Sequence, residues 1–267
     1  MKNKVPVVIL CGGQGTRMRG NTLTKKELVT IGGRPVIWHV MRIFSAHGFN
    51  DFVLTLGYQA GQIRRYFLEY ESMSRDFTVQ LGEPSNDSAQ SPIKFHGAVQ
   101  HPPWAVTLVD TGLHTEKGSR VARVAHHLRS AERFFVSYGD DVADVDLAAL
   151  YDFHKSHGRL ATITSVQVDF QYGVLQVDDS ARVTAYEQYP RLPHWINGGF
   201  MLFERPVLDL FADGHDVRLE SEVLATLADK GELMCYRHHG FWQSMNTMKD
   251  NILLEKLWRE GAPWKVW

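Results

Sequence analysis

A glycine-rich loop follows the first apolar stretch of the chain and has the composition of a phosphate-binding site. The apolar run 7–10 leads through Cys11 into Gly12-Gly13-Gln14-Gly15-Thr16-Arg17. Glycines let the backbone come close to an anion and adopt positive φ angles, so that successive amide N–H groups converge on phosphate oxygens. The planar guanidinium of Arg17 adds paired donors for the same oxygens. The sequence therefore predicts a phosphate-binding loop; the alternative is a tight glycine turn between a strand and a helix.

The spacing excludes two familiar phosphate-binding loops. A dinucleotide fingerprint that begins at Gly13 needs a glycine at the position of Met18. A P-loop that begins at Gly15 has its second glycine at Gly20, but Asn21-Thr22 follows where a lysine and a serine or threonine are required. A nicotinamide oxidoreductase is therefore the weakest of the functions considered.

A pair of carboxylates follows a second apolar stretch. Asp140-Asp141 comes directly after the run 134–138 and Gly139. Ligands of open α/β sheets bind beyond the carboxyl ends of the strands, where a carboxylate can hold Mg²⁺ that keeps waters and substrate phosphates as its other ligands. The alternative for such a carboxylate is to cap the next turn, which is plausible for Asp141 or Asp144; we interpret Asp140 as a metal ligand.

Lysines and an asparagine supply further candidate ligands for phosphate and sugar. Lys25 and Lys26 follow the glycine loop, and an ammonium is a compact charge suited to a phosphate leaving group. Without that loop, a solvated surface pair would be an equal interpretation. Asn197, followed by two glycines, can bond a sugar hydroxyl, but Asn-Gly is also the strongest hairpin-turn dipeptide. This segment therefore does not identify a site by itself.

Alternating strands and helices must position these groups. Strands are expected at 7–10, 52–56, 77–81, 106–109, 134–138, 161–168 and 200–203, and helices at 35–48, 62–70, 120–128, 146–157, 207–211, 220–230 and 249–260. Such alternation predicts a parallel sheet covered on both faces. The proline- and serine-rich stretch 84–104 is expected to be a long polar loop, and 173–186 a hairpin that turns at 178–180.

Composition limits the class of protein and its partners. The chain has 267 residues, 44% of them hydrophobic and 22% charged, with a net charge of −1. We expect one domain over 1–267, with a loop insertion at about 84–104 and a C-terminal helical tail at about 248–267. A near-neutral chain without a basic block argues against nucleic acid as a partner. No apolar run approaches the roughly 18 residues of a membrane span, and Cys11 and Cys235 form no disulfide framework. A cytoplasmic protein without a membrane partner is expected.

These motifs together resemble the sugar-1-phosphate nucleotidyltransferases, and most closely the glucose-1-phosphate cytidylyltransferases. The similarity covers nearly the entire chain. It rests on the segments 12–17, 31–39, 56–58, 104–112, 138–140, 196–200, 240–243 and 262–265.

The resemblance implies a fold and a reaction. The fold would be Rossmann-like, of the nucleotide-diphospho-sugar transferase type: a mostly parallel sheet with helices on both faces, plus a small β-rich region for substrate binding or oligomerisation. An oxygen of a sugar 1-phosphate would attack the α-phosphorus of an NTP, most simply CTP, and pyrophosphate would leave. Mg²⁺ would be the cofactor, and a homo-oligomer the assembly.

The resemblance also implies roles for individual residues. The catalytic set would be Arg17, Lys26 and Asp140. The nucleotide would contact Leu10, Gly12, Gly13, Gly15, Thr16, Arg17, Lys26, Arg120 and Gly139. The sugar phosphate would contact Tyr172, Gly173, Gln188, Tyr189, Asn197 and Gly198. The metal ligands would be Asp140 and Asn246.

Three departures from the family pattern affect charge. Gln188-Tyr189-Pro190 replaces Glu-Lys-Pro, whose lysine grips the sugar phosphate, and Met245-Asn246-Thr247 replaces Met-Asp-Thr, whose aspartate is the second metal ligand. The family has a doubled Lys-Pro before the segment that begins at Ile31. This chain has Thr24-Lys25-Lys26-Glu27 there, so that only Lys26 matches a family lysine. Losing charge-assisted contacts weakens both metal and acceptor binding. The departures leave two hypotheses: an active enzyme with an altered acceptor, which we prefer, and a catalytically lapsed binding homologue with a regulatory or scaffold role.

Overall fold

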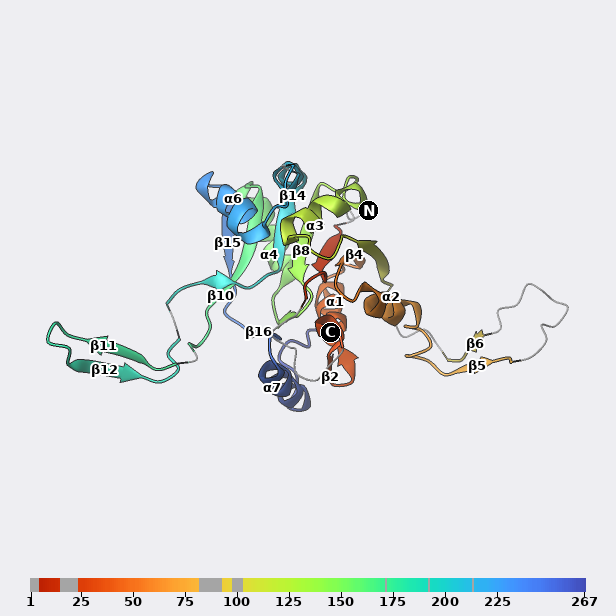
Figure 1. Cartoon of the computed structure of the whole chain (residues 1–267), viewed down its shortest axis with the longest axis horizontal. Helices are drawn as coiled ribbons and strands as arrows, with labels where there is room; N and C mark the ends of the chain where they lie inside the picture. The colour runs from red at the N-terminus through yellow and green to blue at the C-terminus, as the bar shows by residue number, and fades with distance from the viewer. Residues whose placement is uncertain are drawn as a thin grey trace.

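A central sheet of eight strands organises the part of the chain that the structure describes. This computed structural model describes residues 5–14, 24–81, 93–97, 103–170, 172–191, 193–212 and 214–267. The strands follow the order β13-β10-β14-β8-β1-β4-β7, and β15 pairs with β10 (Figure 1). Their bounds are β1 (Val7–Leu10), β4 (Asp51–Leu56), β7 (Ala105–Asp110), β8 (Arg133–Tyr138), β10 (Ala161–Val166), β13 (Ile196–Asn197), β14 (Met201–Glu204) and β15 (Leu233–Arg237).

Parallel pairing brings the ends of the first strands to one edge of the sheet. β1 pairs in parallel with β4 and β8, β4 with β7, and β10 with β15. β14 runs antiparallel to β8 and β10, and β13 antiparallel to β10. The predicted mostly parallel sheet is thus confirmed. In this register Leu10 lies beside both Thr55 and Tyr138, so the loops that follow β1, β4 and β8 leave the sheet together.

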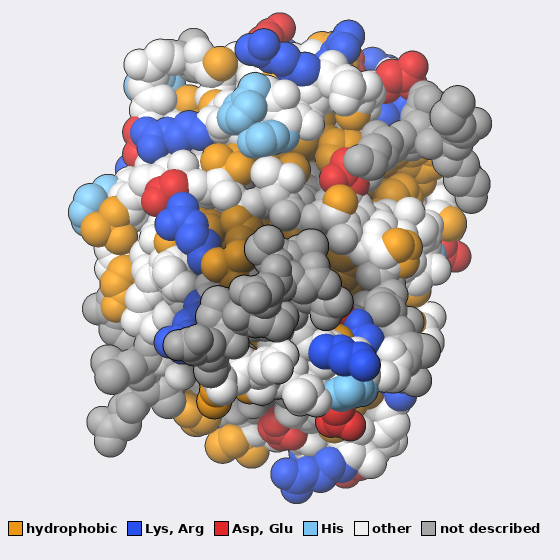
Figure 2. All heavy atoms as spheres, turned by 90° about the vertical axis from the view of Figure 1, so that its right-hand side faces the viewer, with side chains coloured by type: hydrophobic (Ala, Val, Ile, Leu, Met, Phe, Trp, Pro, Cys, Tyr) orange, Lys and Arg blue, Asp and Glu red, His pale blue; other side chains and the backbone are white. Residues whose placement is uncertain are grey.

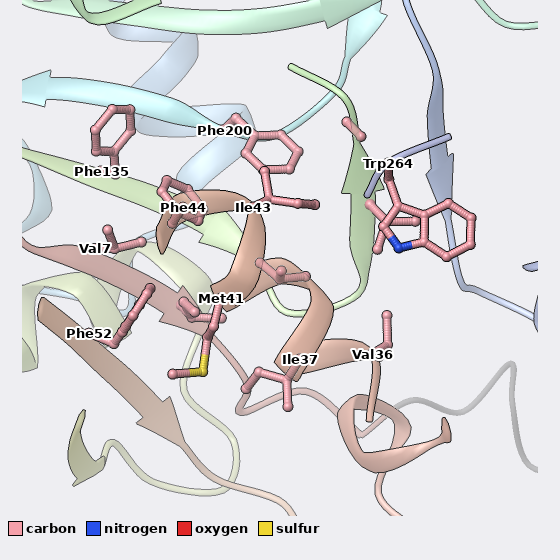
Figure 3. Close-up of a cluster of buried hydrophobic side chains, with 14 of the residues drawn as sticks. Val7, Val36, Ile37, Met41, Ile43, Phe44, Phe52, Phe135, Phe200 and Trp264 are labelled. Atoms are coloured by element: carbon pink, nitrogen blue, oxygen red, sulfur yellow. The ribbon is translucent and has the colours of Figure 1, made fainter. Parts of the chain in front are cut away.

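Side chains of the strands alternate between two buried clusters. Val7 and Ile9 belong to one cluster, and Val8 and Leu10 to the other, as the period of two in a strand requires. The first cluster is packed by α1 (Val36–Ala46), whose Phe44 ring lies 5.3 Å from Phe135 and 5.5 Å from Phe200 between centroids (Figure 3).

Helices cover both faces of the sheet, as predicted. The second cluster takes side chains from α3 (Lys117–Val124), α5 (Leu208–Phe211) and α6 (Ala225–Asp229). The first takes side chains from α1, α2 (Ala60–Leu68), α4 (Leu147–His157) and α7 (Met248–Arg259). No helix among the described residues is long and apolar enough to cross a membrane.

Two hairpin arms project from opposite sides of the body in Figure 1. One consists of β11 (Val174–Val177) and β12 (Val183–Glu187), which confirms the predicted hairpin. The other pairs β5 (Phe77–Val79) with β6 (Ile93–Phe95), so the expectation of a loop throughout 84–104 was wrong for these three residues. β6 forms because its apolar side chains pair with those of β5, with the Phe77 and Phe95 rings 5.8 Å apart. Figure 2 shows hydrophobic side chains lying open among charged ones on the face that carries this second arm.

Several short elements were not expected from the sequence. These are β2 (Thr30–Ile31), β3 (Arg34–Pro35), β9 (Asp141–Ala143), β13, β15 and β16 (Trp242–Ser244). β9 and β16 pair with each other, which places Ser244 opposite Asp141. In addition, α3 begins at Lys117 rather than at Arg120, and a π-helical segment, η5 (Leu219–Leu224), precedes α6.

Candidate active site

A cavity of about 540 Å³ lies at the edge where β1 and β8 end. Its size suits a small-molecule substrate, since ligand pockets typically measure about 300–1,000 Å³. Eight of the residues predicted from the sequence line this cavity, and they come from distant parts of the chain. They are Leu10, Gly12, Gly13, Lys26, Arg120, Asp140, Asn197 and Asn246.

The remaining predicted residues lie elsewhere. Gly15, Thr16 and Arg17 fall outside the described residues. Gly139 and Gly198 do not line the cavity themselves, but each is adjacent in sequence to a residue that does. The Gly198 carbonyl accepts a hydrogen bond from Trp242 Nε1 at 2.9 Å. Tyr172, Gly173, Gln188 and Tyr189 belong to the β11–β12 arm or its base and are absent from the described lining of the cavity. Tyr189 is 61% exposed, so the structure does not bring these four residues to the others.

Lys26, Asp140 and Asn246 converge at the centre of the cavity. The Lys26 ammonium forms an ion pair with Asp140 Oδ2 and donates a hydrogen bond to Asn246 Oδ1 at 2.9 Å. Lys26 comes from the short 3₁₀ helix η2 (Lys26–Leu28), and Asp140 follows β8 after one residue, Gly139. Two oxygen acceptors and a cation from three segments therefore meet at one point, and their roles in binding stay predictions.

The start of α7 fixes the position of Asn246. Thr247 and Asp250 form a capping box in which Asp250 Oδ2 accepts hydrogen bonds from the amides of Asn246 and Thr247 at 3.0 and 2.7 Å. The Asn246 side-chain amide donates to Ser244 Oγ at 2.8 Å, which turns Oδ1 toward Lys26. Met245 N bonds the Asp140 carbonyl at 3.0 Å and ties this segment to the end of β8. Helix capping thus holds the backbone at Asn246, and the hydrogen bond to Ser244 determines which side-chain atom faces Lys26.

The donor set at this point fits a hard divalent cation. Asp140 offers a carboxylate oxygen and Asn246 an amide oxygen, and both oxygens contact the Lys26 ammonium. Mg²⁺ prefers oxygen ligands and is usually held by one or two protein groups together with waters and substrate phosphates. No cluster of three or more histidine, cysteine or acidic residues that could hold a metal occurs among the described residues. Asp140 and Asn246 could therefore hold such a cation only together with waters or substrate oxygens.

Two buried carboxyl groups accompany Asp140. Burial, followed by the charge of Asp140, raises the pKa of Asp141 to about 8. Burial also raises the pKa of Glu27 to about 7, with Asp140 adding to the increase and Lys25 opposing it. Neither group was expected in the site from the sequence, although the doubled aspartate after a buried strand was a signal for Asp141. Both groups line the cavity.

Lys25 does not face the cavity. Its side chain is 2% exposed, donates to the Gly13 carbonyl and lies 3.3 Å from Glu27 Oε2. Its ammonium also lies 5.8 Å from the ring centroid of Tyr58. Lys25 therefore stabilises the glycine loop through its buried contact with Gly13, while its neighbour Lys26 faces the cavity.

Arg120 clamps the start of the glycine loop. Its Nη1 donates to the carbonyls of Leu56 and Gly112 at 3.1 and 2.8 Å and to Thr111 Oγ1 at 2.8 Å. Its Nη2 donates at 3.3 Å to the carbonyls of Gly12 and Leu113. The residue is 4% exposed. Arg120 therefore stabilises the loop through backbone carbonyls, and its predicted contact with phosphate stays a prediction.

A polar cluster lines the other side of the cavity. Asn197 Nδ2 donates to Tyr138 Oη at 3.1 Å, and Tyr138 Oη donates to Glu220 Oε1 at 2.8 Å. Lys117 forms an ion pair with the same Glu220 oxygen. Sequence reasoning found Asn197 but missed the other three. Tyr138 carried a signal, because it ends a buried strand just before Gly139-Asp140, whereas Lys117 and Glu220 belong to no motif.

Comparisons with known proteins agree with this geometry. The fold resembles HddC from Yersinia pseudotuberculosis, with a TM-score of 0.68 and 20% identity over 95% of this chain and 99% of that one. It also resembles a putative glucose-1-phosphate thymidylyltransferase from Bacillus anthracis, with a TM-score of 0.68 and 16% identity over 96% of both chains. These likenesses define the class of fold, a nucleotide-diphospho-sugar transferase sheet.

Sequence comparison defines the family. The nucleotidyl transferase family model matches residues 6–250. The chain is 41% identical to a glucose-1-phosphate cytidylyltransferase of Salmonella typhi over 97% of this chain and 98% of that protein. It is 36% identical to a probable glucose-1-phosphate cytidylyltransferase of Bacillus subtilis over 97% and 99%. The chain therefore belongs to the nucleotidyl transferase family, and the resemblance noted in its motifs is confirmed.

Proposed function

We propose that this nucleotidyltransferase joins the cytidylyl group of CTP to a sugar 1-phosphate, with glucose 1-phosphate as the first candidate acceptor. Relatives that bear the name glucose-1-phosphate cytidylyltransferase match nearly the whole chain, which supports this assignment. The single observation that carries it is the convergence of Lys26, Asp140 and Asn246 in one cavity. That arrangement suits a triphosphate with a divalent cation.

The proposed reaction needs positioning and charge neutralisation rather than a covalent intermediate. A phosphate oxygen of the sugar 1-phosphate attacks the α-phosphorus of CTP, a new P–O bond forms, and the bond between the α-phosphorus and the bridging oxygen breaks. The electron pair leaves with pyrophosphate. Lys26 holds positive charge beside the phosphates, and the glycine loop at Gly12 and Gly13 orients the nucleotide. When bound at Asp140 and Asn246, Mg²⁺ supplies further charge neutralisation.

The predicted ligands divide between the two substrates. We assign Leu10, Gly12, Gly13, Gly15, Thr16, Arg17, Lys26, Arg120 and Gly139 to the nucleotide. Asn197 and Gly198 belong to the acceptor, on the opposite side of the cavity. Tyr172, Gly173, Gln188 and Tyr189 are also assigned to the acceptor, although they are absent from the described lining of this cavity. Apolar side chains exposed on that arm, such as Leu175 and Val177, support a homo-oligomer.

The same proposal covers organisation and location. We treat 1–267 as one nucleotidyltransferase domain with two projecting arms. Free cysteines at Cys11 and Cys235 suit the reducing cytoplasm. The lapsed-homologue alternative loses support because Asn246 still directs an oxygen at Lys26.

Pyrophosphate release tests the proposal. The chain is assayed with Mg²⁺, each of four NTPs and several sugar 1-phosphates, including glucose 1-phosphate. Release with CTP and a sugar 1-phosphate supports the assignment, and the best acceptor names the sugar. Release with another NTP corrects the base. Binding of CTP by calorimetry without pyrophosphate release from any pair favours the lapsed homologue.

A further inference from the structure

A second lysine stands in the cavity, outside the motifs that carry the family resemblance. Of the described residues that line the cavity, two are lysines, Lys26 and Lys117. Lys26 is engaged by Asp140 and Asn246. Lys117 is the first residue of α3, and its side chain is 48% exposed. Its ammonium has three N–H donors, and the ion pair with Glu220 uses one of them.

Hydrogen bonds between their neighbours in sequence hold Lys117 close to Glu220. The amide of Ser119 donates to the Val217 carbonyl at 3.1 Å, and the Val217 amide donates to Ser119 Oγ at 2.7 Å. A Cβ at Gly118 would lie 2.6 Å from the Val217 carbonyl oxygen, so this close approach requires glycine. The first turn of α3 and the segment before η5 are thus locked together, and the position of Lys117 is built into the fold.

The same lysine belongs to the acceptor side of the cavity. Its ammonium lies 5.0 Å from the ring centroid of Tyr138. The Tyr138 hydroxyl bonds both Glu220 and Asn197, the residue assigned to the sugar. Lys117 therefore belongs to the same hydrogen-bonded cluster as Asn197. Lys26 instead contacts Asp140 and Asn246, the residues assigned to the metal.

A phosphate monoester needs a cation on this side. The resemblance noted in the sequence implies a phosphate-binding lysine at the position of Tyr189, but Tyr189 has no ammonium group and is 61% exposed on the arm. We propose that Lys117 binds the phosphate of the sugar 1-phosphate and supplies the positive charge that position 189 lacks. Glu220 orients the ammonium, and Tyr138 links it to Asn197. This inference rests on the proposed function, because it assigns one of that reaction's substrates.

Substitutions of Lys117 test the inference with steady-state kinetics. In Lys117→Met, which keeps the length of the side chain without its charge, the KM for glucose 1-phosphate should rise about tenfold to a hundredfold, as for a lost hydrogen bond to a charged group. The KM for CTP should change less than about twofold. Lys117→Arg, which retains the charge, should restore most of the affinity for glucose 1-phosphate.

A matched control comes from the other end of the sheet. Lys155 lies on α4, with its ammonium 5.8 Å from the ring centroid of Tyr151. Tyr151 accepts a hydrogen bond from Arg133 at the start of β8, away from the cavity. Lys155→Met removes the same charge from a similar tyrosine contact, so its KM values should equal those of the wild type.

Calorimetry with glucose 1-phosphate, with and without CTP, separates this inference from the proposed function. Binding to the wild type that Lys117→Met weakens supports the role of Lys117, even if no pyrophosphate is released. Three results overturn it: an effect on CTP as large as that on glucose 1-phosphate, unchanged values for both, or no sugar-phosphate binding by the wild type.

Discussion

Replacing Gly12 by alanine should test whether Arg120 clamps the start of the glycine loop. A Cβ built at Gly12 would lie 2.6 Å from Arg120 Nε, and closer still to Cζ and Nη1. A carbon atom cannot occupy that position unless the guanidinium moves. Because Arg120 is buried and bonded to acceptors on Leu56, Thr111 and Gly112, its movement breaks several contacts together.

The size of the effect follows from those contacts. Each hydrogen bond contributes about 0.5–1.5 kcal/mol net, and a buried charge that loses its partners costs about 3–5 kcal/mol. We therefore expect Gly12→Ala to lower the free energy of unfolding by about 3–5 kcal/mol. Since a protein of this size shifts by about 2–4 °C per kcal/mol, the midpoint of thermal unfolding should fall by roughly 10 °C.

Urea unfolding followed by circular dichroism measures this change, and the next residue in the loop provides the control. A Cβ at Gly13 would meet no atom within 4 Å. Gly13→Ala should therefore stay within about 0.5 kcal/mol of the wild type, as surface substitutions usually do. Any general sensitivity of the loop to alanine would appear in both variants, whereas the clash with Arg120 appears only in Gly12→Ala.

A double-mutant cycle with Arg120→Ala identifies the cause. Once the guanidinium is gone, the three atoms nearest to the added Cβ are gone as well. Gly12→Ala should then cost less than about 1 kcal/mol, so the two substitutions should be strongly non-additive. Strict additivity would refute the reasoning, and so would equal losses in Gly12→Ala and Gly13→Ala. Either result would mean that Gly12 is required for a reason other than the clamp.

Three further predictions concern charge in the cavity. Asn246→Asp adds a carboxylate beside Asp140, so the Mg²⁺ concentration for half-maximal activity should fall about tenfold, as for a gained charge-assisted contact; a magnesium titration that shows no decrease contradicts the metal assignment. Asp140→Asn should lower kcat on the order of 10²–10³-fold, as for the loss of one preorganised charge contact, with an unchanged circular dichroism spectrum; wild-type kcat would remove Asp140 from the catalytic set. Glu27 has a folded-state pKa raised from 4.5 to about 7, so it binds its proton more tightly in the folded state, and stability falls as the pH rises through that window and stays low above it. Glu27→Gln should therefore match the wild type near pH 4 and exceed its stability at pH 8 by about 3 kcal/mol; parallel stability profiles across this range would contradict the burial argument.

The elements that the sequence predicted correctly are those with local signals. The run 7–10 is apolar throughout because β1 is buried on both faces, and the glycines after it mark the end of a strand whatever the rest of the chain does. Asp140 was identifiable for the same reason, since it follows another buried strand. Parallel pairing then brings the two loops together, so the centre of the site was predictable from two local patterns and one rule of topology.

The elements that the sequence did not predict depend on distant partners. From the sequence, this helix was expected to span 120–128 and thus to begin at Arg120. In the structure the Glu116 amide is held by the Asp216 carboxylate at 2.9 Å, a hundred residues along the chain, and the helix begins at Lys117. Likewise, nothing local distinguishes Lys25 from Lys26, yet one is buried beneath the loop and the other faces the cavity.

These distant contacts change what the departures from the family pattern mean. From the sequence, Asn246 and Tyr189 replace charged ligands, and both losses point to weakened or lapsed catalysis. In the structure Asn246 Oδ1 accepts a hydrogen bond from Lys26. Lys117 of α3 is linked through Glu220 and Tyr138 to Asn197, the residue that we propose for the acceptor. The charge of a cavity is the sum over every segment that reaches it, so a neutral residue at one motif position does not by itself make the cavity neutral. The contacts of Asn246 and Lys117 therefore favour an active enzyme whose acceptor phosphate is held from a different element of the fold.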